Sequence, residues 1–459
     1  MMINQQLENK LDTQSVGKAF MQYLIPSLLG MLLVAINIVV DGIMVGNKLG
    51  STALAGIGIA SPVYTLFVAM SLWIGIGGAT MYSQAMGAKD TQKAQTIFST
   101  SVTLIFAATL LIGISAFVFR ESLVFSLGAN ADTFPFASAY MNVMLLFGFV
   151  FTVENAVSIF VRNDGNPYLS MAAQITFAVS NIVLNYIILY VLDYGVAGVA
   201  FGTIIAASLG LCVLLTHFLR KRSNLKLRRF KWNRVLITAI FVIGFPSFLA
   251  ELGISAFTIS HNNTLKWIAG TDGVAAFTVM NYVHSLILLT FLGLGGAIQP
   301  LISYYYGGQQ QDKIRQTLRI AVKTAIIAGV GLFVIVQLAT THIVGIFGNF
   351  DVQVVNHAVN GLRIFVTAYL FMGINFVMMT YYQSIGNVRM ATWITASREL
   401  IIMFILILVL PHLIGITGVW LAVPLSECIV LLTIVLYYRK NAGSITNFAV
   451  PASQKERTL

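Results

Sequence analysis

The sequence predicts an all-α polytopic membrane protein, with twelve transmembrane helices arranged in two pseudo-symmetric lobes of six helices. Composition gives the first reason, because 58% of the residues are hydrophobic, only 9% are charged and the mean hydropathy is +0.85. Soluble domains carry about 25% charged residues. The second reason is a series of apolar segments, each long enough to cross a bilayer. The third is that the second half of the chain repeats the first.

Twelve apolar segments are predicted to span the membrane. They are predicted to be helices because lipid offers no hydrogen-bond partner to an unpaired backbone group, which costs several kcal/mol. Runs such as 104–119 and 401–410 contain no charged residue. The predicted spans lie near residues 20–45, 53–84, 97–119, 134–160, 168–192, 195–218, 236–260, 273–303, 318–347, 361–381, 391–411 and 415–438.

The internal repeat relates residues that lie 220 positions apart. Pro26 aligns with Pro246, and Gly50 aligns with Gly270. Such matches are informative because proline and glycine mark backbone positions with unusual dihedral angles or close packing. A membrane protein built from two such halves is expected to bind its substrate at the seam between them. Further pairs with the same separation are Gly75 and Gly295, Gly87 and Gly307, Gly195 and Gly415, and Gly198 and Gly418.

These patterns predict four parts in the chain. Residues 1–218 are expected to form an N-terminal six-helix lobe, and residues 236–440 a C-terminal six-helix lobe. Residues 219–235 are expected to form a basic cytoplasmic linker, and residues 441–459 a cytoplasmic tail. The first eighteen residues are polar and the first apolar stretch is long, so no cleavable signal peptide is expected.

The placement of the basic residues predicts the orientation of the chain. The net charge is +11, and eight of the 27 Lys and Arg lie between Arg220 and Arg234. Cytoplasmic loops carry an excess of Lys and Arg, so both termini and the linker are expected to face the cytoplasm. The linker is expected to lie against anionic headgroups rather than to bind nucleic acid. With that orientation, 22 of the 27 Lys and Arg fall on the cytoplasmic side, and the other five are Lys48, Arg120, Lys266 and Arg363 on the outer side and Arg398 within a span.

The sequence disfavours an enzyme. It contains no GxxxxGK[ST], HExxH, GxSxG or CxxC motif, so ATP hydrolysis, other catalysis and a bound cofactor are not expected. Cys212 and Cys428 lie far apart within predicted spans. Packing is a more common role for such cysteines than a disulfide bond or a metal site.

A group of polar residues in the first half predicts a cation site. Ionisable residues within spans are costly and are therefore candidates for function. Asp41 lies late in the first span, with Asn37 one helical turn earlier. The fifth span carries Asn181 and Asn185, also one turn apart, and Thr203 follows in the sixth span. If these spans are neighbours, the cluster can hold a proton or a small hard cation. The alternatives are that Asp41 caps a helix at the outer interface and that the Asn and Thr side chains join helices.

Two acids and one amide are candidates for binding a substrate. Glu251 lies five residues after Pro246, where the proline can bend the helix and free a carbonyl group. A carboxylate at such a bend could meet a cationic substrate in the seam. The competing interpretation is a buried neutral acid that is hydrogen-bonded to a neighbour. Glu154 and Asn281 are further candidates for the same role.

The remaining charges within spans are interpreted as structural. Arg398 and Glu399 are interpreted as a structural polar contact, because adjacent residues on an α-helix face apart and neither is then aimed at a shared site. Glu427 follows a proline and is placed in the same class. The repeat is not chemically symmetric, because Asp41 aligns with His261. We therefore expect a cation site in the first half and a different task for the second.

Five short motifs recur in a fixed order along the chain, namely GGATMYSQAMGAKD (77–90), VRNDGNP (161–167), GGAIQPLISYYYGGQ (295–309), YQSIGN (382–387) and GITGVWLAVPLSE (415–427). Their order and spacing resemble those of the multidrug and toxic compound extrusion family. The resemblance extends from about residue 17 to residue 440, and the chain looks most like the bacterial branches related to the DNA-damage-inducible and Gram-positive multidrug exporters.

The resemblance implies export of cationic, lipophilic drugs in exchange for H⁺ or Na⁺. The family's first-span aspartate matches Asp41, its fifth-span asparagine matches Asn181, and its sixth-span threonine matches Thr203. Many members have a second aspartate where this chain has Asn185, so Asp41 is left as the only acid of the cluster. The seventh-span glutamate of some members matches Glu251, which hints at a second ion or drug site.

Three alternatives share parts of this pattern. A lipid-linked oligosaccharide flippase would have the same layout but should carry more cationic residues in its cleft. A membrane-embedded enzyme or sensor is disfavoured by the two-lobe repeat. A major-facilitator transporter would carry a Gly-Asp-Arg-type motif after the second span, where this chain reads MGAKDTQK. The expected protein is a monomer in the bacterial plasma membrane.

Overall fold

The computed structural model describes residues 10–220, 223–347 and 351–445, and the regular elements in this part of the chain are all helices. The predicted tail from residue 446 onward and residues 221–222 of the predicted linker lie outside the described residues. The first half contains α1 (Lys10–Thr13), α2 (Val16–Gly87), α3 (Thr91–Val118), α4 (Arg120–Ser126), α5 (Phe134–Asn163), α6 (Pro167–Tyr186), η1 (Ile187–Val191), α7 (Gly195–Leu215) and η2 (Thr216–Leu219). The second half contains α8 (Arg234–Gly307), α9 (Gln311–Ile346), α10 (Val352–Phe365), η3 (Val366–Ala368), α11 (Tyr369–Ser384), α12 (Val388–Ala396), η4 (Ser397–Ile401), α13 (Ile402–Ile414) and α14 (Ile416–Ile445).

Ten of the described helices are long and apolar enough to cross a membrane, and two of them fold back on themselves. A straight helix with the 72 residues of α2 would be about 108 Å long, more than three times the ~30 Å hydrocarbon core. The backbone leaves the helical conformation at Gly50 in α2 and at Gly270 in α8. In α8 the rings of His261 and Phe277 stack with centroids 5.2 Å apart, which requires a reversal between them. The two folded helices account for the twelve predicted spans, so that prediction is confirmed.

The turns fall at glycines that the repeat pairs. Gly50 has φ +83° and Gly270 has φ +60°, a region that glycine occupies without steric cost. Gly195 and Gly415 also form a repeat pair, and both have φ +62°. The interpretation of these matches as positions with unusual dihedral angles is therefore correct.

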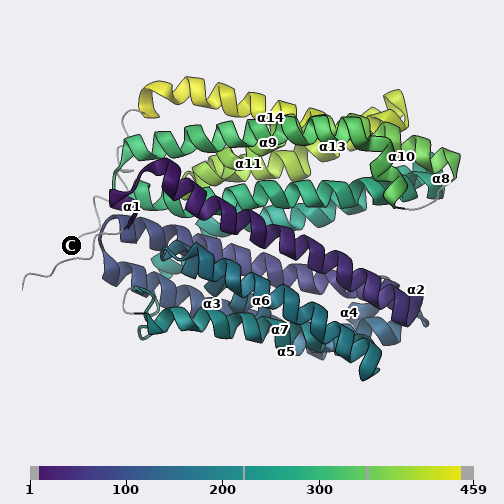
Figure 1. Cartoon of the computed structure of the whole chain (residues 1–459), viewed down its shortest axis with the longest axis horizontal. Coiled ribbons are helices and arrows are strands. Elements are labelled where there is room, and N and C mark those ends of the chain that lie inside the picture. Colours follow the sequence, from purple (N-terminus) through teal and green to yellow (C-terminus); the bar gives the residue numbers. More distant parts are fainter. Residues whose placement is uncertain (1–9, 221–222, 348–350, 446–459) are drawn as a thin grey trace, which may run out of the picture.

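The molecule consists of two bundles that lie side by side (Figure 1). We call the bundle from α2 to η2 lobe 1 and the bundle from α8 to α14 lobe 2. The largest apolar core lies in lobe 2 and also takes in the start of α2, including Phe20 and Tyr23. The end of the molecule that holds α1 and the segment between η2 and α8 is called the linker end, and the end that holds Gly50 and Gly270 is called the turn end. Figure 1 shows the linker end on the left.

Glycines allow the two lobes to touch at the linker end. A Cβ atom at Gly87 would collide with the carbonyl of Tyr304, and a Cβ atom at Gly307 would collide with the carbonyl of Gln84. Gln84 and Tyr304 are themselves a repeat pair, so this contact is pseudo-twofold symmetric. The parts of α2 before and after Gly50 are called its first and second arms, and Gly244 of α8 lies in the same way against the backbone of the second arm.

Amide hydrogen bonds join the lobes at the same end. Gln84 Nε2 donates to the carbonyl of Ser384 at 2.8 Å. Gln299 Nε2 donates to Thr80 Oγ1 at 3.2 Å and to Asn163 Oδ1 at 3.1 Å. These contacts close the molecule at the linker end, so that any opening between the lobes must lie toward the turn end.

Candidate functional site

The structure brings all five residues of the predicted cation site together inside lobe 1. Asn185 Nδ2 donates to Asp41 Oδ1 at 2.9 Å, and Asn37 Nδ2 donates to Asn181 Oδ1 at 2.9 Å. Asn181 Nδ2 lies 3.2 Å from Thr203 Oγ1. The two asparagines of α6 are fully buried, and Asp41 is partly buried. Asp41 is therefore part of an internal polar cluster rather than an isolated cap at the interface.

The amide of Asn181 contacts Asp41 directly. One terminal amide atom lies 2.8 Å from Asp41 Oδ2 and 3.0 Å from Oδ1. If this atom is the nitrogen, it donates to both carboxylate oxygens while Asn181 Oδ1 accepts from Thr203 at 3.2 Å. If it is the oxygen, the contact requires a proton on Asp41, because two unprotonated acceptors repel at this distance. The geometry thus fits both the ionised and the protonated carboxyl group, with the amide turned over between them.

Local backbone features position this cluster. The π-helix η1 begins two residues after Asn185, and π-helical turns are frequent at functional sites. Gly202 of α7 leaves room for the Asn185 side chain, since a Cβ atom there would collide with Asn185 Oδ1. The asparagine pair can therefore approach both α2 and α7 from one face of α6.

The other two predicted acids lie apart from this cluster. Glu251 is partly buried on α8 and lies within electrostatic range of Tyr64 in lobe 1. Glu154 is buried on α5, with Oε1 next to the site of a Cβ atom on Gly210. Among the described residues, neither carboxylate has a hydrogen-bond partner. The interpretation of Glu251 as an acid bonded to a neighbour therefore has no support in this structure.

A cavity of about 370 Å³ lies between the first arm of α2 and α8, toward the turn end. Cavities of about 300–1,000 Å³ are typical for small-molecule ligands. Asn281, a predicted substrate-binding residue, lines this cavity, whereas Glu251 and Glu154 do not. The complete lining is Ala35, Ile38, Val39, Thr258, Asn262, Phe277, Thr278, Asn281, Tyr282, Ser285, Leu286 and Leu289.

The charges of lobe 2 form a cluster of three residues, of which the sequence predicted only the contact between Arg398 and Glu399. Arg398 Nη2 lies 3.0 Å from Glu427 Oε1 and 3.2 Å from Glu399 Oε1. Glu427 Oε2 accepts from Asn375 Nδ2 at 2.7 Å. The expected contact between Arg398 and Glu399 is present, although adjacent residues on an α-helix face apart. The π-helix η4 contains both residues and changes the helical register there. The sequence signal for this cluster was the presence of three ionisable residues, Arg398, Glu399 and Glu427, within the last two predicted spans.

Comparisons with known proteins agree with the fold and with the repeat. A family model described as MatE matches residues 26–187 and 246–409, and the two matches begin at the aligned prolines. The multidrug export protein MepA of Staphylococcus saprophyticus is 27% identical over 432 residues, which cover 93% of this chain and 94% of that protein.

Solved structures have the same fold. One is described as the outward-facing conformation of a multidrug resistance MATE family transporter of the MOP superfamily. It has a TM-score of 0.89 at 23% identity and covers 95% of this chain and 98% of that chain. A second, a MOP superfamily transporter from Pyrococcus furiosus whose description notes reverse polarity of the binding pocket, gives the same values. The family model covers most of the sequence in two copies, one in each lobe, and the chain therefore belongs to the MatE family.

Proposed function

We propose that this protein is a secondary active multidrug exporter, which exchanges cationic lipophilic compounds for a coupling ion by alternating access. The observation that carries the proposal is the lone carboxylate Asp41 in an internal cluster of amide and hydroxyl groups within lobe 1. The name of the MepA relative and the motif resemblance support the same function. The proposed protein works as a monomer in the bacterial plasma membrane.

The proposed coupling ion is the proton. Asn185 and, in one orientation, Asn181 donate hydrogen bonds to Asp41, and these hydrogen bonds favour the ionised carboxylate without a metal ion. In the other orientation Asn181 accepts a proton held on Asp41. A Na⁺ ion would instead need several oxygen ligands around the carboxylate, and the amides would have to turn to supply them. Coupling to Na⁺ is therefore the alternative that the transport experiment below distinguishes from coupling to protons.

Coupling follows if the proton and the drug favour different conformations. The state described here is closed at the linker end, which the proposal places in the cytoplasm. Protonation of Asp41 from outside would favour one conformation and bound drug the other, so that each promotes release of its counterpart. Because the only acid of the lobe 1 cluster is Asp41, one group carries the exchange in this lobe.

The charge of the cavities favours a cationic substrate over a lipid-linked sugar. In the part of the chain that the structure describes, the 370 Å³ cavity has no Lys or Arg in its lining. Arg398 lies nearby but is paired with two carboxylates. A pyrophosphate group would therefore meet no unpaired cation in this lining, which disfavours the flippase alternative.

The direct test is transport in liposomes that contain the purified full chain. A pH gradient imposed alone should drive movement of a cationic dye, and a Na⁺ gradient imposed alone should not. Transport with the Na⁺ gradient only would identify Na⁺ as the coupling ion. Absence of transport with either gradient would contradict secondary active export.

Cysteine labelling tests the proposed orientation. With Cys212 and Cys428, both exposed, replaced by serine, we expect Lys231→Cys to be protected from a membrane-impermeant maleimide in intact cells. Asp193→Cys, exposed at the turn end, should be labelled under the same conditions. The reason is the concentration of basic residues at the linker end. Labelling of Lys231→Cys from outside would reverse the topology.

Replacement of Glu251 tests its proposed role at the seam. We expect Glu251→Gln to weaken transport of cationic dyes more than transport of neutral ones, because a partly buried carboxylate without a hydrogen-bond partner attracts cations. Initial rates in liposomes measure the ratio. Equal loss for both classes of dye, or no loss, would assign Glu251 a structural role.

A further inference from the structure

A second, smaller cavity opens inside lobe 2 beside the first. It has a volume of about 50 Å³, enough for one or two water molecules. Thr258, Asn281 and Ser285 line both cavities, so the two are adjacent. Arg398, Glu399 and Glu427 are part of the lining of the small cavity. An elongated ligand could thus place its body in the large cavity and its end group in the small one.

In their ionised forms, the side chains of the charged cluster around the small cavity carry an excess negative charge. Two carboxylates, Glu399 and Glu427, face one guanidinium, that of Arg398. Both carboxylate oxygens of Glu427 accept hydrogen bonds, one from Arg398 and the other from Asn375. Only Oε1 of Glu399 forms an ion pair with Arg398, and within the described residues Oε2 has no hydrogen-bond partner. Glu399 is therefore the carboxylate that can accept a hydrogen bond from a ligand.

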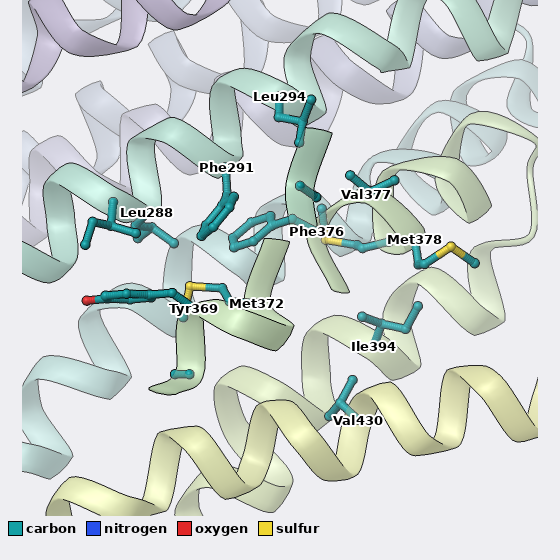
Figure 2. Close-up of a cluster of buried hydrophobic side chains, with 14 of the residues drawn as sticks. Leu288, Phe291, Leu294, Tyr369, Met372, Phe376, Val377, Met378, Ile394 and Val430 are labelled. Atoms are coloured by element: carbon teal, nitrogen blue, oxygen red, sulfur yellow. The ribbon is translucent and has the colours of Figure 1, made fainter. Parts of the chain in front are cut away.

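Packing holds this cluster in place. The Arg398 guanidinium lies over the ring of Phe376, with Cζ 3.9 Å from the ring centroid. Figure 2 shows Phe376 in the apolar core of lobe 2, near Phe291 and Met372. Gly253 of α8 makes room for Glu399, because a Cβ atom there would lie only 2.8 Å from Glu399 Cγ. A rigid arrangement of this kind selects the geometry of a ligand.

Two buried polar atoms in the lining point to a missing ligand. Among the described residues, Arg398 Nη1 and His284 Nδ1 have no hydrogen-bond partner, and both side chains are more than nine-tenths buried. Unsatisfied buried groups are uncommon in native proteins. An unprotonated His284 Nδ1 can accept a hydrogen bond from an N–H group, as can Glu399 Oε2, while Arg398 Nη1 can donate to a water that enters with the ligand.

We propose that Glu399 recognises the ammonium end of a transported compound, with Arg398 and Glu427 as positioning residues. This inference rests on the proposed export function and names the substrate class, a lipophilic amine with an accessible N⁺–H group. The apolar body lies against residues such as Ile38 and Leu286 of the large cavity. The ammonium group enters the small cavity and donates hydrogen bonds to Glu399 and His284.

Binding to purified full-length protein without an ion gradient tests the proposal. The probe is dansylcadaverine, a lipophilic primary amine, and its matched neutral control is the N-acetyl derivative. Glu399→Gln should weaken dansylcadaverine binding about tenfold or more, because a charge-assisted hydrogen bond is lost. Binding of the N-acetyl derivative should not change. Glu121→Gln, an exposed residue on α4, is the control variant and should change neither affinity.

A second variant tests the proposal independently if Glu399→Gln does not fold. Gly253→Ala keeps every charge but displaces Glu399, and it should weaken dansylcadaverine selectively as well. Equal weakening of both probes, or no weakening, overturns the proposal. Unchanged dansylcadaverine binding together with lost ion-driven transport would identify Glu399 as an ion site, which also overturns it. Failure of the proposed function is distinguishable, because then wild-type protein shows no gradient-driven transport at all.

Discussion

Asp41→Asn should abolish ion-driven efflux while the protein remains folded and inserted in the membrane. The amide cannot release or take up a proton, so the cluster that it forms with Asn37, Asn181 and Asn185 would be fixed in a neutral state. Hydrogen bonding to Asn185 survives if the new amide presents its oxygen, which is why the fold should persist. Dye transport by liposomes carrying the variant should fall to the rate of liposomes without protein.

The matched control for this substitution is Asp193→Asn. Asp193 is exposed at the turn end and forms a 3.2 Å ion pair with Lys48. Exposed ion pairs contribute little to stability, about 0–1 kcal/mol, and asparagine tolerates the positive φ of this position. The control should transport dye at the wild-type rate. Dye transport by purified Asp41→Asn at the wild-type rate would refute the assignment of the coupling site.

Gly244→Val should prevent closure of the lobes at the linker end and therefore stop transport. A side chain at Gly244 would collide with the backbone carbonyl of Trp73 and approach the backbone of Gly77. A flexible side chain could move away from such a collision, but a helical backbone cannot without separating the lobes. The conformational equilibrium should shift toward states that are open at the linker end.

Spin labels can measure this shift. Gln92 and Asp312 are exposed repeat partners near the linker end, one in each lobe, and cysteines there provide the label pair. The mean distance between the labels should increase in Gly244→Val. Gly331→Val is the matched control, because a Cβ atom at Gly331 meets no other atom within 4 Å. An unchanged label distance, with transport intact, would show that the linker-end contact is not part of the cycle.

The lobe 1 cluster was predictable because local spacing defines it. Asn37 and Asp41 lie one helical turn apart in the first span, as do Asn181 and Asn185 in the fifth. Each pair therefore shares one helical face, and the fold needed only to bring two faces together. The unusual backbone conformation of Gly50 was predictable for another reason, because the repeat pairs this glycine with Gly270.

The lobe 2 cluster was not predictable because it depends on a local departure from the α-helix. Arg398 and Glu399 would diverge on a regular helix, and only η4 lets both approach one point. Hydrophobic patterning also cannot assign a buried face to a neighbour. Phe20 and Tyr23 belong to the first predicted span, yet they pack in the core of lobe 2.

Proton release on drug binding tests the central claim most directly, namely that a drug and a proton on Asp41 favour different conformations. Purified protein in weakly buffered detergent solution is mixed with dansylcadaverine, and a pH indicator records the protons released. Wild-type protein should release protons as the drug binds, and Asp41→Asn should bind the drug without releasing them. Drug binding to wild-type protein without proton release, or equal release by the variant, would contradict coupling through Asp41.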